Sequence, residues 1–99
     1  MNWVWTWGGR SFGYIEGEDL WTYDGKHVGK LHGTDIYDSR GNYLGEIINE
    51  NRLITCISKK HYRGYSFTPY ANRAGYANYA NYASYAMYAG YEDFPKLER

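Results

Sequence analysis

The sequence predicts an all-β fold of tandem β-hairpins followed by a tyrosine-rich C-terminal arm, and three observations lead to this prediction. Units of 16 residues follow one another without a gap from 5 to 20, 21 to 36 and 37 to 52, and a degenerate fourth unit begins at Leu53. Near the C-terminus, six tyrosines recur at every third position. Within the units, glycines keep a fixed register, at Gly9, Gly25, Gly41 and at Gly13, Gly29, Gly45.

Each unit has the pattern of one hairpin and one connecting turn. In the second unit, Asp24-Gly25 separates an aromatic run from a β-branched one, which indicates a tight hairpin turn because glycine accepts positive φ. A second polar break follows at His32–Asp35, again with a glycine. Asn49 takes that place in the third unit, and asparagine is the next most tolerant residue of positive φ.

The strands alternate, so that Leu20 and Thr22 share one face and Trp21 and Tyr23 share the other. Gly29, with its counterparts in the other units, is interpreted as space for a neighbouring ring or as a bend in the sheet.

A single hairpin is marginal in water, so we expect successive hairpins to pack side by side. Four of them can close into a ring, which removes the exposed edges of the sheet. The alternative is an open solenoid, which would need distinct capping repeats. The prediction is therefore a shallow, closed barrel with four-fold pseudo-symmetry.

An aromatic residue, an Asp-Gly-Lys turn and a hydrophobic-Gly-x-hydrophobic step such as Val28–Leu31 recur in this chain. In these features it resembles the four-fold beta flower proteins over about residues 3–65. The resemblance implies a small bacterial protein of unestablished function, with four hairpin petals around a shallow barrel and no catalytic residues. The fourth unit departs from the pattern, because Ile57 stands at the turn-glycine position and Lys60-His61 replaces the glycine step.

The predicted organisation is a repeat domain over 1–66 and an arm over 67–99. Residues 74–91 of the arm carry no charge. A period of three places every tyrosine on one edge only in a three-residue helix, so polyproline-II-like extension ranks before α-helix and disorder. The predicted interaction residues of the arm are Tyr76, Tyr79, Tyr82, Tyr85, Tyr88 and Tyr91.

An extended arm would be about 65–70 Å long, whereas a domain of this size is about 30 Å across. We therefore expect an ordered, extended arm to need a partner, and another copy of the chain is the simplest one, in an oligomer or filament. The alternatives are an unspecific linker, docking on its own domain, and binding of a foreign ligand through stacked rings.

Composition narrows the function classes. The formal net charge is zero, which argues against binding to nucleic acid or an anionic membrane. Cys56 is the single cysteine, so we expect a buried thiol and no disulfide within the chain. No apolar run is long enough to span a bilayer, and no signal peptide is recognisable, so a cytoplasmic location is the default expectation.

The sequence contains no recognisable catalytic or metal-binding set. His27, His32 and His61 are interpreted as exposed turn residues, and Cys56 with His61 lacks a third orienting group. Two other groups are candidates for binding a glycan, a peptide or single-stranded nucleic acid. They are the tryptophans and the basic cluster, namely Trp5, Trp7, Trp21, Lys59, Lys60 and Arg63.

We therefore expect a non-enzymatic structural or assembly protein without a cofactor, in which a ladder of tyrosines mediates self-association or docks within the chain. The alternative is a binding module that recognises its ligand through exposed aromatic side chains.

Overall fold

The computed structural model describes residues 1–97 as an all-β protein: a closed barrel of seven strands with one extra strand and a single 3₁₀ turn, without an α-helix in this range. Neighbouring strands are antiparallel along the chain order. The elements are β1 Asn2–Thr6, β2 Ser11–Glu16, β3 Asp19–Thr22, β4 His27–His32, β5 Asp35–Tyr37, β6 Tyr43–Ile48, β7 Arg52–Cys56, η1 Ile57–Lys59 and β8 Tyr91–Asp93.

The barrel closes between its first and seventh strands. β1 pairs with β7 in parallel, with Trp5 opposite Arg52 and Thr6 opposite Leu53. The fourth unit does not form a return strand of its own, because the chain leaves the barrel after Cys56 through η1. Instead β8, from near the C-terminus, adds to β7 in antiparallel pairing. The departure at Ile57 and Lys60-His61 thus changes the fourth hairpin without opening the barrel.

The turns adopt the conformations that the glycine register predicts. Gly9, Gly25 and Gly41 have φ of 97°, 95° and 87° in the hairpin turns. In the second set of turns Asn49, at φ 51°, replaces the glycines of the earlier units. The long hairpins also share an irregularity in β1, β3 and β5, between Val4/Trp5, Leu20/Trp21 and Ile36/Tyr37. Such bulges increase the local twist that a small barrel needs.

Alternation of the strands separates an inner from an outer face. Leu20 is fully buried in the barrel core, whereas Trp21 lies on the outside against other aromatic rings. A Cβ at Gly45 would lie 2.7 Å from the Phe94 ring, so this glycine provides the space for a ring that was predicted, whereas one at Gly29 would collide with Ile36. The buried apolar cluster consists of Val4, Phe12, Ile15, Leu20, Ile36, Leu53 and Phe94.

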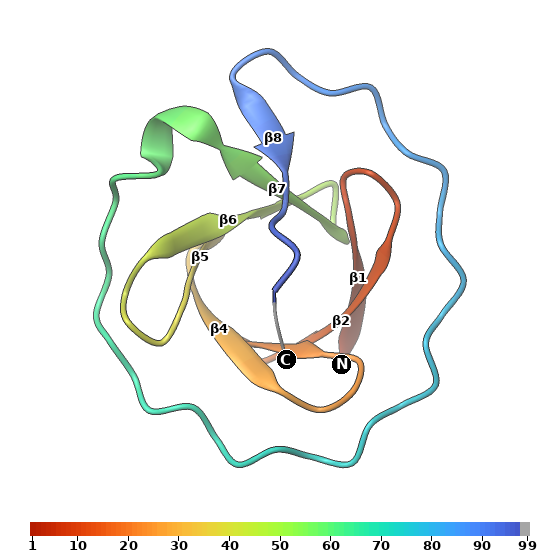
Figure 1. Ribbon diagram of the computed structural model, residues 1–99, viewed down its shortest axis with the longest axis vertical. Helices are drawn as coiled ribbons and strands as arrows, with labels where there is room; N and C mark the ends of the chain where they lie inside the picture. Colours follow the sequence, from red (N-terminus) through yellow and green to blue (C-terminus); the bar gives the residue numbers. More distant parts are fainter. Residues whose placement is uncertain (98–99) are drawn as a thin grey trace.

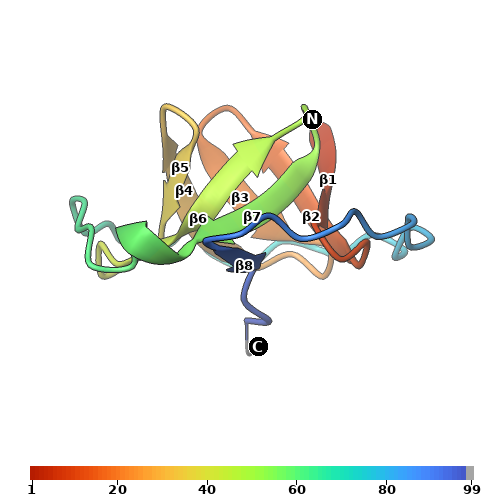
Figure 2. The same ribbon diagram turned by 90° about the horizontal axis from the view of Figure 1, so that it is seen from above.

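The segment between η1 and β8 runs in extended form around the outside of the barrel (Figure 1). Viewed from the side, it lies as a flat ring near one end of the barrel, whereas the N-terminus lies at the other end (Figure 2). After β8 the chain turns beneath the barrel, where Phe94 enters the core and packs edge-on against Phe12 at 5.3 Å. No helix in residues 1–97 is long and apolar enough to cross a membrane.

Candidate functional site

The extended arm is held to the barrel by main-chain hydrogen bonds in a regular register. The N–H groups of Gly64, Arg73 and Tyr82 donate to the carbonyl oxygens of Gly41, Gly25 and Gly9, respectively, at 2.7, 2.8 and 2.8 Å. The donors are nine residues apart and the acceptors 16 residues apart, in opposite directions along the chain. Three tyrosine steps of the arm therefore match one hairpin of the barrel.

A second series of bonds repeats this register. Phe67, Tyr76 and Tyr85 donate to the carbonyl oxygens of Ser39, Tyr23 and Trp7, at 3.0, 2.7 and 3.1 Å. At the fourth unit the direction reverses, and Ile57 N–H donates to Gly90 O at 2.9 Å beside β8. Backbone groups that have no partner in a hairpin turn are thus satisfied by the arm.

The tyrosines at every third position turn one face towards the barrel. Tyr82 stacks on Trp5 with the ring centroids 3.8 Å apart, and Tyr85 lies 4.7 Å from Trp7. Tyr79 meets Trp3 edge-on at 4.6 Å. Tyr76 contacts Trp3 and Tyr14, Tyr88 contacts Trp7, and Tyr91 contacts Tyr88. From Tyr76 to Tyr88 the tyrosines keep 46–51% of their surface exposed, so their outer edges face solvent.

The extended arm does not need another copy of the chain as its support, contrary to the expectation from its length. It follows the perimeter of the barrel rather than crossing its width (Figure 1). The long axes of the molecule are 36 and 32 Å, so a perimeter of about 100 Å accommodates about 30 residues at ~3.1 Å each. The extended arm therefore lies on its own chain without turning back.

The three candidate tryptophans are covered by this arm. Trp5, Trp7 and Trp21 are only 6, 2 and 1% exposed. The indole N–H of Trp5 donates to Ala80 O at 2.9 Å, and that of Trp7 to Ala86 O at 3.0 Å. The expectation that these rings offer stacking surfaces to a ligand is corrected by this burial.

Arg52 joins the arm to the closure of the barrel, a role that the sequence pattern does not indicate. Its side chain is buried, with Nη1 donating to Trp7 O at 3.1 Å and Nη2 donating to Ala83 O at 2.9 Å. The guanidinium carbon lies 4.0 Å from the centroid of the Tyr85 ring. The only signal in the sequence is a charged residue at the start of the apolar run that follows it.

His27 is the second residue that differs from expectation, because it is buried rather than exposed. Its Nδ1 accepts the N–H of Tyr70 at 3.0 Å, and its Nε2 lies 2.9 Å from Asp19 Oδ1. The ring stacks against both Trp21 and Tyr70, which also stack on each other. Burial lowers the pKa of His27, and the neighbouring Asp19 opposes this shift only in part. His32 and His61 are exposed, as expected.

The basic cluster is paired with carboxylates of the same chain. Lys59 Nζ lies 3.1 Å from Asp35 and 3.6 Å from Glu46, and Lys60 Nζ lies 2.6 Å from Glu92. Arg63 donates to the carbonyl oxygens of Lys60 and Tyr62. These contacts compensate much of the positive charge that a nucleic acid would need.

Cys56 is free and buried, as expected, and belongs to a small polar cluster behind Lys59. Its N–H donates to Tyr43 Oη at 3.0 Å, and that hydroxyl donates to Glu46 Oε2 at 3.2 Å. Burial is the main cause that raises the pKa of Tyr43. Within residues 1–97, no three His, Cys, Asp or Glu side chains are grouped so as to hold a metal ion.

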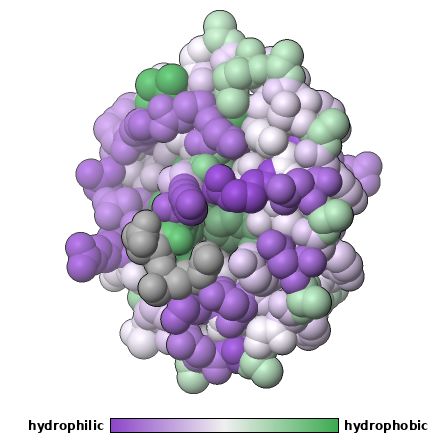
Figure 3. Space-filling model, turned by 45° about the vertical axis from the view of Figure 1, so that its right-hand side comes forward, coloured by the Kyte–Doolittle hydropathy of each residue, from purple (hydrophilic) through white to green (hydrophobic). Residues whose placement is uncertain are grey.

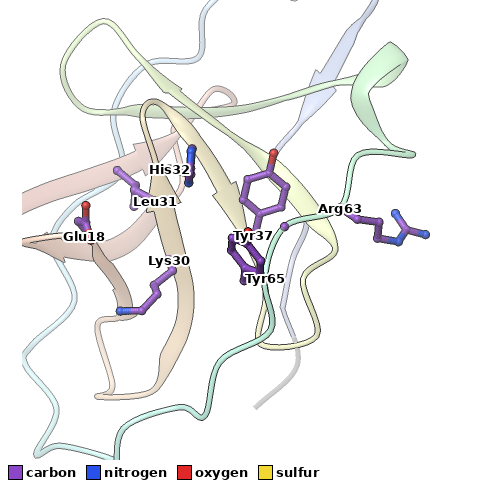
Figure 4. A pocket seen from close by; sticks show the side chains of 8 residues that line it. Glu18, Lys30, Leu31, His32, Tyr37, Arg63 and Tyr65 are labelled. Atoms are coloured by element: carbon purple, nitrogen blue, oxygen red, sulfur yellow. The ribbon is translucent and has the colours of Figure 1, made fainter.

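A cavity of about 570 Å³ lies between β4, β5 and the beginning of the arm. Figure 4 shows Tyr37, Arg63 and Tyr65 on one side of the cavity and Glu18 and Lys30 on the other. Tyr65 is 93% exposed, more than any other large hydrophobic side chain in the described part of the chain. The cavity is lined by Glu18, Lys30, Leu31, His32, Tyr37, Arg63, Gly64 and Tyr65.

A family model described as 4-fold beta flower protein matches residues 1–88, which covers both the barrel and most of the arm. Neither the curated proteins nor the solved structures give a match.

Proposed function

The chain belongs to the 4-fold beta flower protein family, and from this premise we propose that it is a non-enzymatic structural protein whose tyrosine-rich arm is docked on the barrel of its own chain. The observation that carries the proposal is the register between arm and turns. Bonds from Gly64, Arg73 and Tyr82 reach equivalent glycine carbonyls in three successive hairpins. A linker without a function would not be expected to keep that register.

In this proposal the 16-residue units are four pseudo-symmetric petals, and the arm is the element that completes the fourth. The turn glycines and the strand irregularities recur once per unit in the first three petals. β8 then supplies the strand that residues after Cys56 do not form. The arm also covers the outer tryptophans, so the flat barrel gains a second apolar layer that its few strands could not otherwise provide.

The absence of catalytic activity is part of the proposal and has its own support. The titratable groups that the fold brings together are engaged with one another: Asp19 with His27 and Lys30, and Glu46 with Lys59 and Tyr43. Each of these sets fixes one edge of a petal to the chain beside it, which is a structural role.

Quenching of tryptophan fluorescence by acrylamide tests the docked arm. We expect weak quenching at micromolar protein that does not change with protein concentration, because the covering tyrosines belong to the same chain. The Tyr82→Ser variant should increase quenching, since it uncovers Trp5. Tyr65→Ser is the matched control and should leave quenching unchanged, because that ring is 93% exposed. Quenching as strong as in urea, or protection that appears only at high concentration, would overturn the proposal.

Self-association is the second candidate function, and the outer edges of the tyrosines favour it. The rim from residue 74 to 91 carries no charge, and its tyrosines are half exposed. In the view of Figure 3, hydrophobic residues form small separate groups rather than one broad patch. A surface of this kind suits weak contacts between copies through ring edges and hydroxyls, on top of an arm that remains docked.

A further inference from the structure

One segment of the arm is held to the barrel through a side chain that can take up a proton. The N–H groups of Phe67 and Arg73 donate to main-chain carbonyl oxygens of the barrel at 3.0 and 2.8 Å. Between these two points the N–H of Tyr70 donates to Nδ1 of His27 at 3.0 Å. Main-chain carbonyl groups do not titrate, whereas an imidazole changes its charge between about pH 5 and 8. The segment 68–72 therefore has a pH-sensitive attachment between two insensitive ones.

The arm and the barrel together enclose the His27 ring, which is 6% exposed. On the barrel side Trp21 stacks on it with the ring centroids 5.0 Å apart. On the arm side Tyr70 stacks on it at 5.0 Å, and Phe67 lies tilted at the same distance. Water cannot hydrate a charged ring in this position while the arm is docked, so protonation of the ring opposes docking of the segment.

The hydrogen bond from Tyr70 fixes which nitrogen of His27 carries the proton. Nδ1 must offer its lone pair to accept this N–H, so the proton of the neutral ring is on Nε2. A second proton would place an N–H on Nδ1, directed at the N–H of Tyr70. Two donors would then face each other, and the amide of Tyr70 would be left without an acceptor.

The charged groups around the ring compensate a second proton only in part. Asp19 Oδ1 lies 2.9 Å from Nε2 and favours a protonated ring. The same oxygen is shared with Lys30 Nζ at 3.1 Å, and that ammonium disfavours a second cation beside it. On the arm, Arg73 is paired with Glu16 at 2.9 Å. Burial of the ring outweighs Asp19 and lowers the pKa of His27, so the docked segment keeps the neutral form.

We propose that His27 is an acid-operated latch: when its ring takes up a proton, the segment 68–72 lifts from the barrel while the tyrosine ladder beyond it stays docked. Lifting the Tyr70 ring uncovers one side of Trp21, which is 1% exposed in the closed form. The fold would thus present an additional aromatic surface in acid. The inference rests on the docked arm of the proposed function and adds a means of regulating it.

The direction of the pH effect follows from the two forms of the segment. In the open form the solvated ring has the ordinary histidine pKa of about 6.5, whereas its pKa is lowered in the closed form. Opening therefore takes up a proton and becomes more favourable as the pH falls below that value. For one proton the population of the open form rises by at most about tenfold per pH unit.

Amide hydrogen exchange of the full-length protein, measured by NMR at pH 7.5 and pH 5.5, tests the latch. After correction for the intrinsic exchange rate, we expect the protection of the Tyr70 amide to fall by up to about tenfold. The amide of Tyr82, which donates to Gly9 O, should change less than twofold. Equal falls at Tyr70 and Tyr82, or a change of less than twofold at Tyr70, would overturn the inference.

Two variants assign the effect to one ring. His27→Gln keeps an acceptor that does not titrate, so the protection of Tyr70 should become independent of pH. His32→Gln removes an exposed histidine from the same strand and should keep the wild-type response. A pH response that persists in His27→Gln would overturn the latch.

The wild type alone provides a second test, which does not depend on the folding of a variant. The ring signals of His27 should titrate below the ordinary value of about 6.5, and titration at or above that value would overturn the latch. Absence of protection at Tyr82 already at pH 7.5 would overturn the docked arm and the latch together. Protection at Tyr82 with a Tyr70 amide that does not respond to pH would overturn the latch alone.

Discussion

Single polar residues fix the arm at defined points, and Arg52 shows why each of them is of its particular type. A guanidinium can donate to Trp7 O and Ala83 O in one plane while its face packs against the Tyr85 ring. Lysine has no planar face and could not do both. Arg52 Nε has no hydrogen-bond partner within residues 1–97, so part of the cost of burying this charge remains uncompensated.

His27 makes the stability of the fold depend on pH. Its Nδ1 must be unprotonated to accept the N–H of Tyr70, and its lowered pKa means that the folded state favours the neutral ring. Below the ordinary histidine pKa of about 6.5, the unfolded chain takes up protons that the folded chain does not. Stability is therefore complete above that pH and falls as the pH decreases towards the folded-state pKa.

We expect the urea midpoint to be lower at pH 5 than at pH 7.5, with a slope of at most about 1.4 kcal/mol per pH unit for this one proton. His27→Gln, which keeps an acceptor without a titrating ring, should be less stable than the wild type at pH 7.5. Its urea midpoint should change less between pH 5 and pH 7.5. Asp19 and Lys30 face the same ring and remain in the variant. An unaltered pH dependence in His27→Gln would assign the acid sensitivity to other groups.

At the scale of elements, the arm and the turns depend on each other through close backbone contact. A Cβ at Gly25 would lie 2.0 Å from Arg73 O, and one at Gly9 would lie 2.1 Å from Tyr82 O. Gly33 also has positive φ, of 66°, but a Cβ there would meet nothing within 4 Å. A substitution at Gly33 therefore reports backbone strain alone, whereas one at Gly25 reports strain together with contact with the arm.

Gly25→Ala and Gly33→Ala form a matched pair for this contact. Both should lose about 1–2 kcal/mol because alanine resists positive φ. Gly25→Ala should lose about 1–3 kcal/mol more, since the arm must move away from the turn, and it alone should increase acrylamide quenching of tryptophan. Urea unfolding of both variants provides the measurement. Equal losses, with quenching unchanged in both, would mean that the arm does not press on the turn.

At the scale of the whole molecule, the tyrosine rim is the surface through which copies would associate. Asn78 and Ser84 are exposed between the tyrosines, so a change there alters the rim without removing a docking ring. The double variant Asn78→Glu and Ser84→Glu places like charges on facing copies. We expect it to raise the dissociation constant of the oligomer about tenfold in sedimentation equilibrium, which corresponds to ~1.4 kcal/mol of weaker association.

Thr34→Glu is the control for that experiment, because it adds a charge in the β4–β5 turn at the opposite end of the barrel (Figure 2). It should leave sedimentation unchanged. Self-association through the rim would be contradicted by a wild-type protein that stays monomeric at millimolar concentration, or by an equal effect of both variants.

Much of the fold could be predicted from the sequence, because the patterns that mark turns and strand faces are local. Glycines such as Gly25 mark turns, and the alternation around Leu20 and Trp21 separates the two faces of the sheet. The pairing of β1 with β7 and the entry of Phe94 into the core depend on contacts between residues far apart in the chain, which a period of 16 does not encode.

The candidate site was less accessible for a related reason. The period of three indicated that the tyrosines share one edge, but it did not indicate which surface that edge meets. The burial of Trp5 and His27 follows from the arm that crosses them, and the backbone of Gly64 packs against the ring of Tyr37. Each of these features becomes visible only when the nine-residue step of the arm is aligned with the 16-residue step of the barrel.

The path of the arm also has a consequence for the protein while it is being synthesised on the ribosome. β8 and Phe94, which are translated after the arm, pair with β7 and enter the core of the barrel. At roughly 5–20 residues per second, several seconds separate the synthesis of β7 from that of β8. During that interval Trp5 and Trp7 lack their cover, so an interrupted chain exposes aromatic surface to chaperones and proteases, whereas a finished chain conceals it.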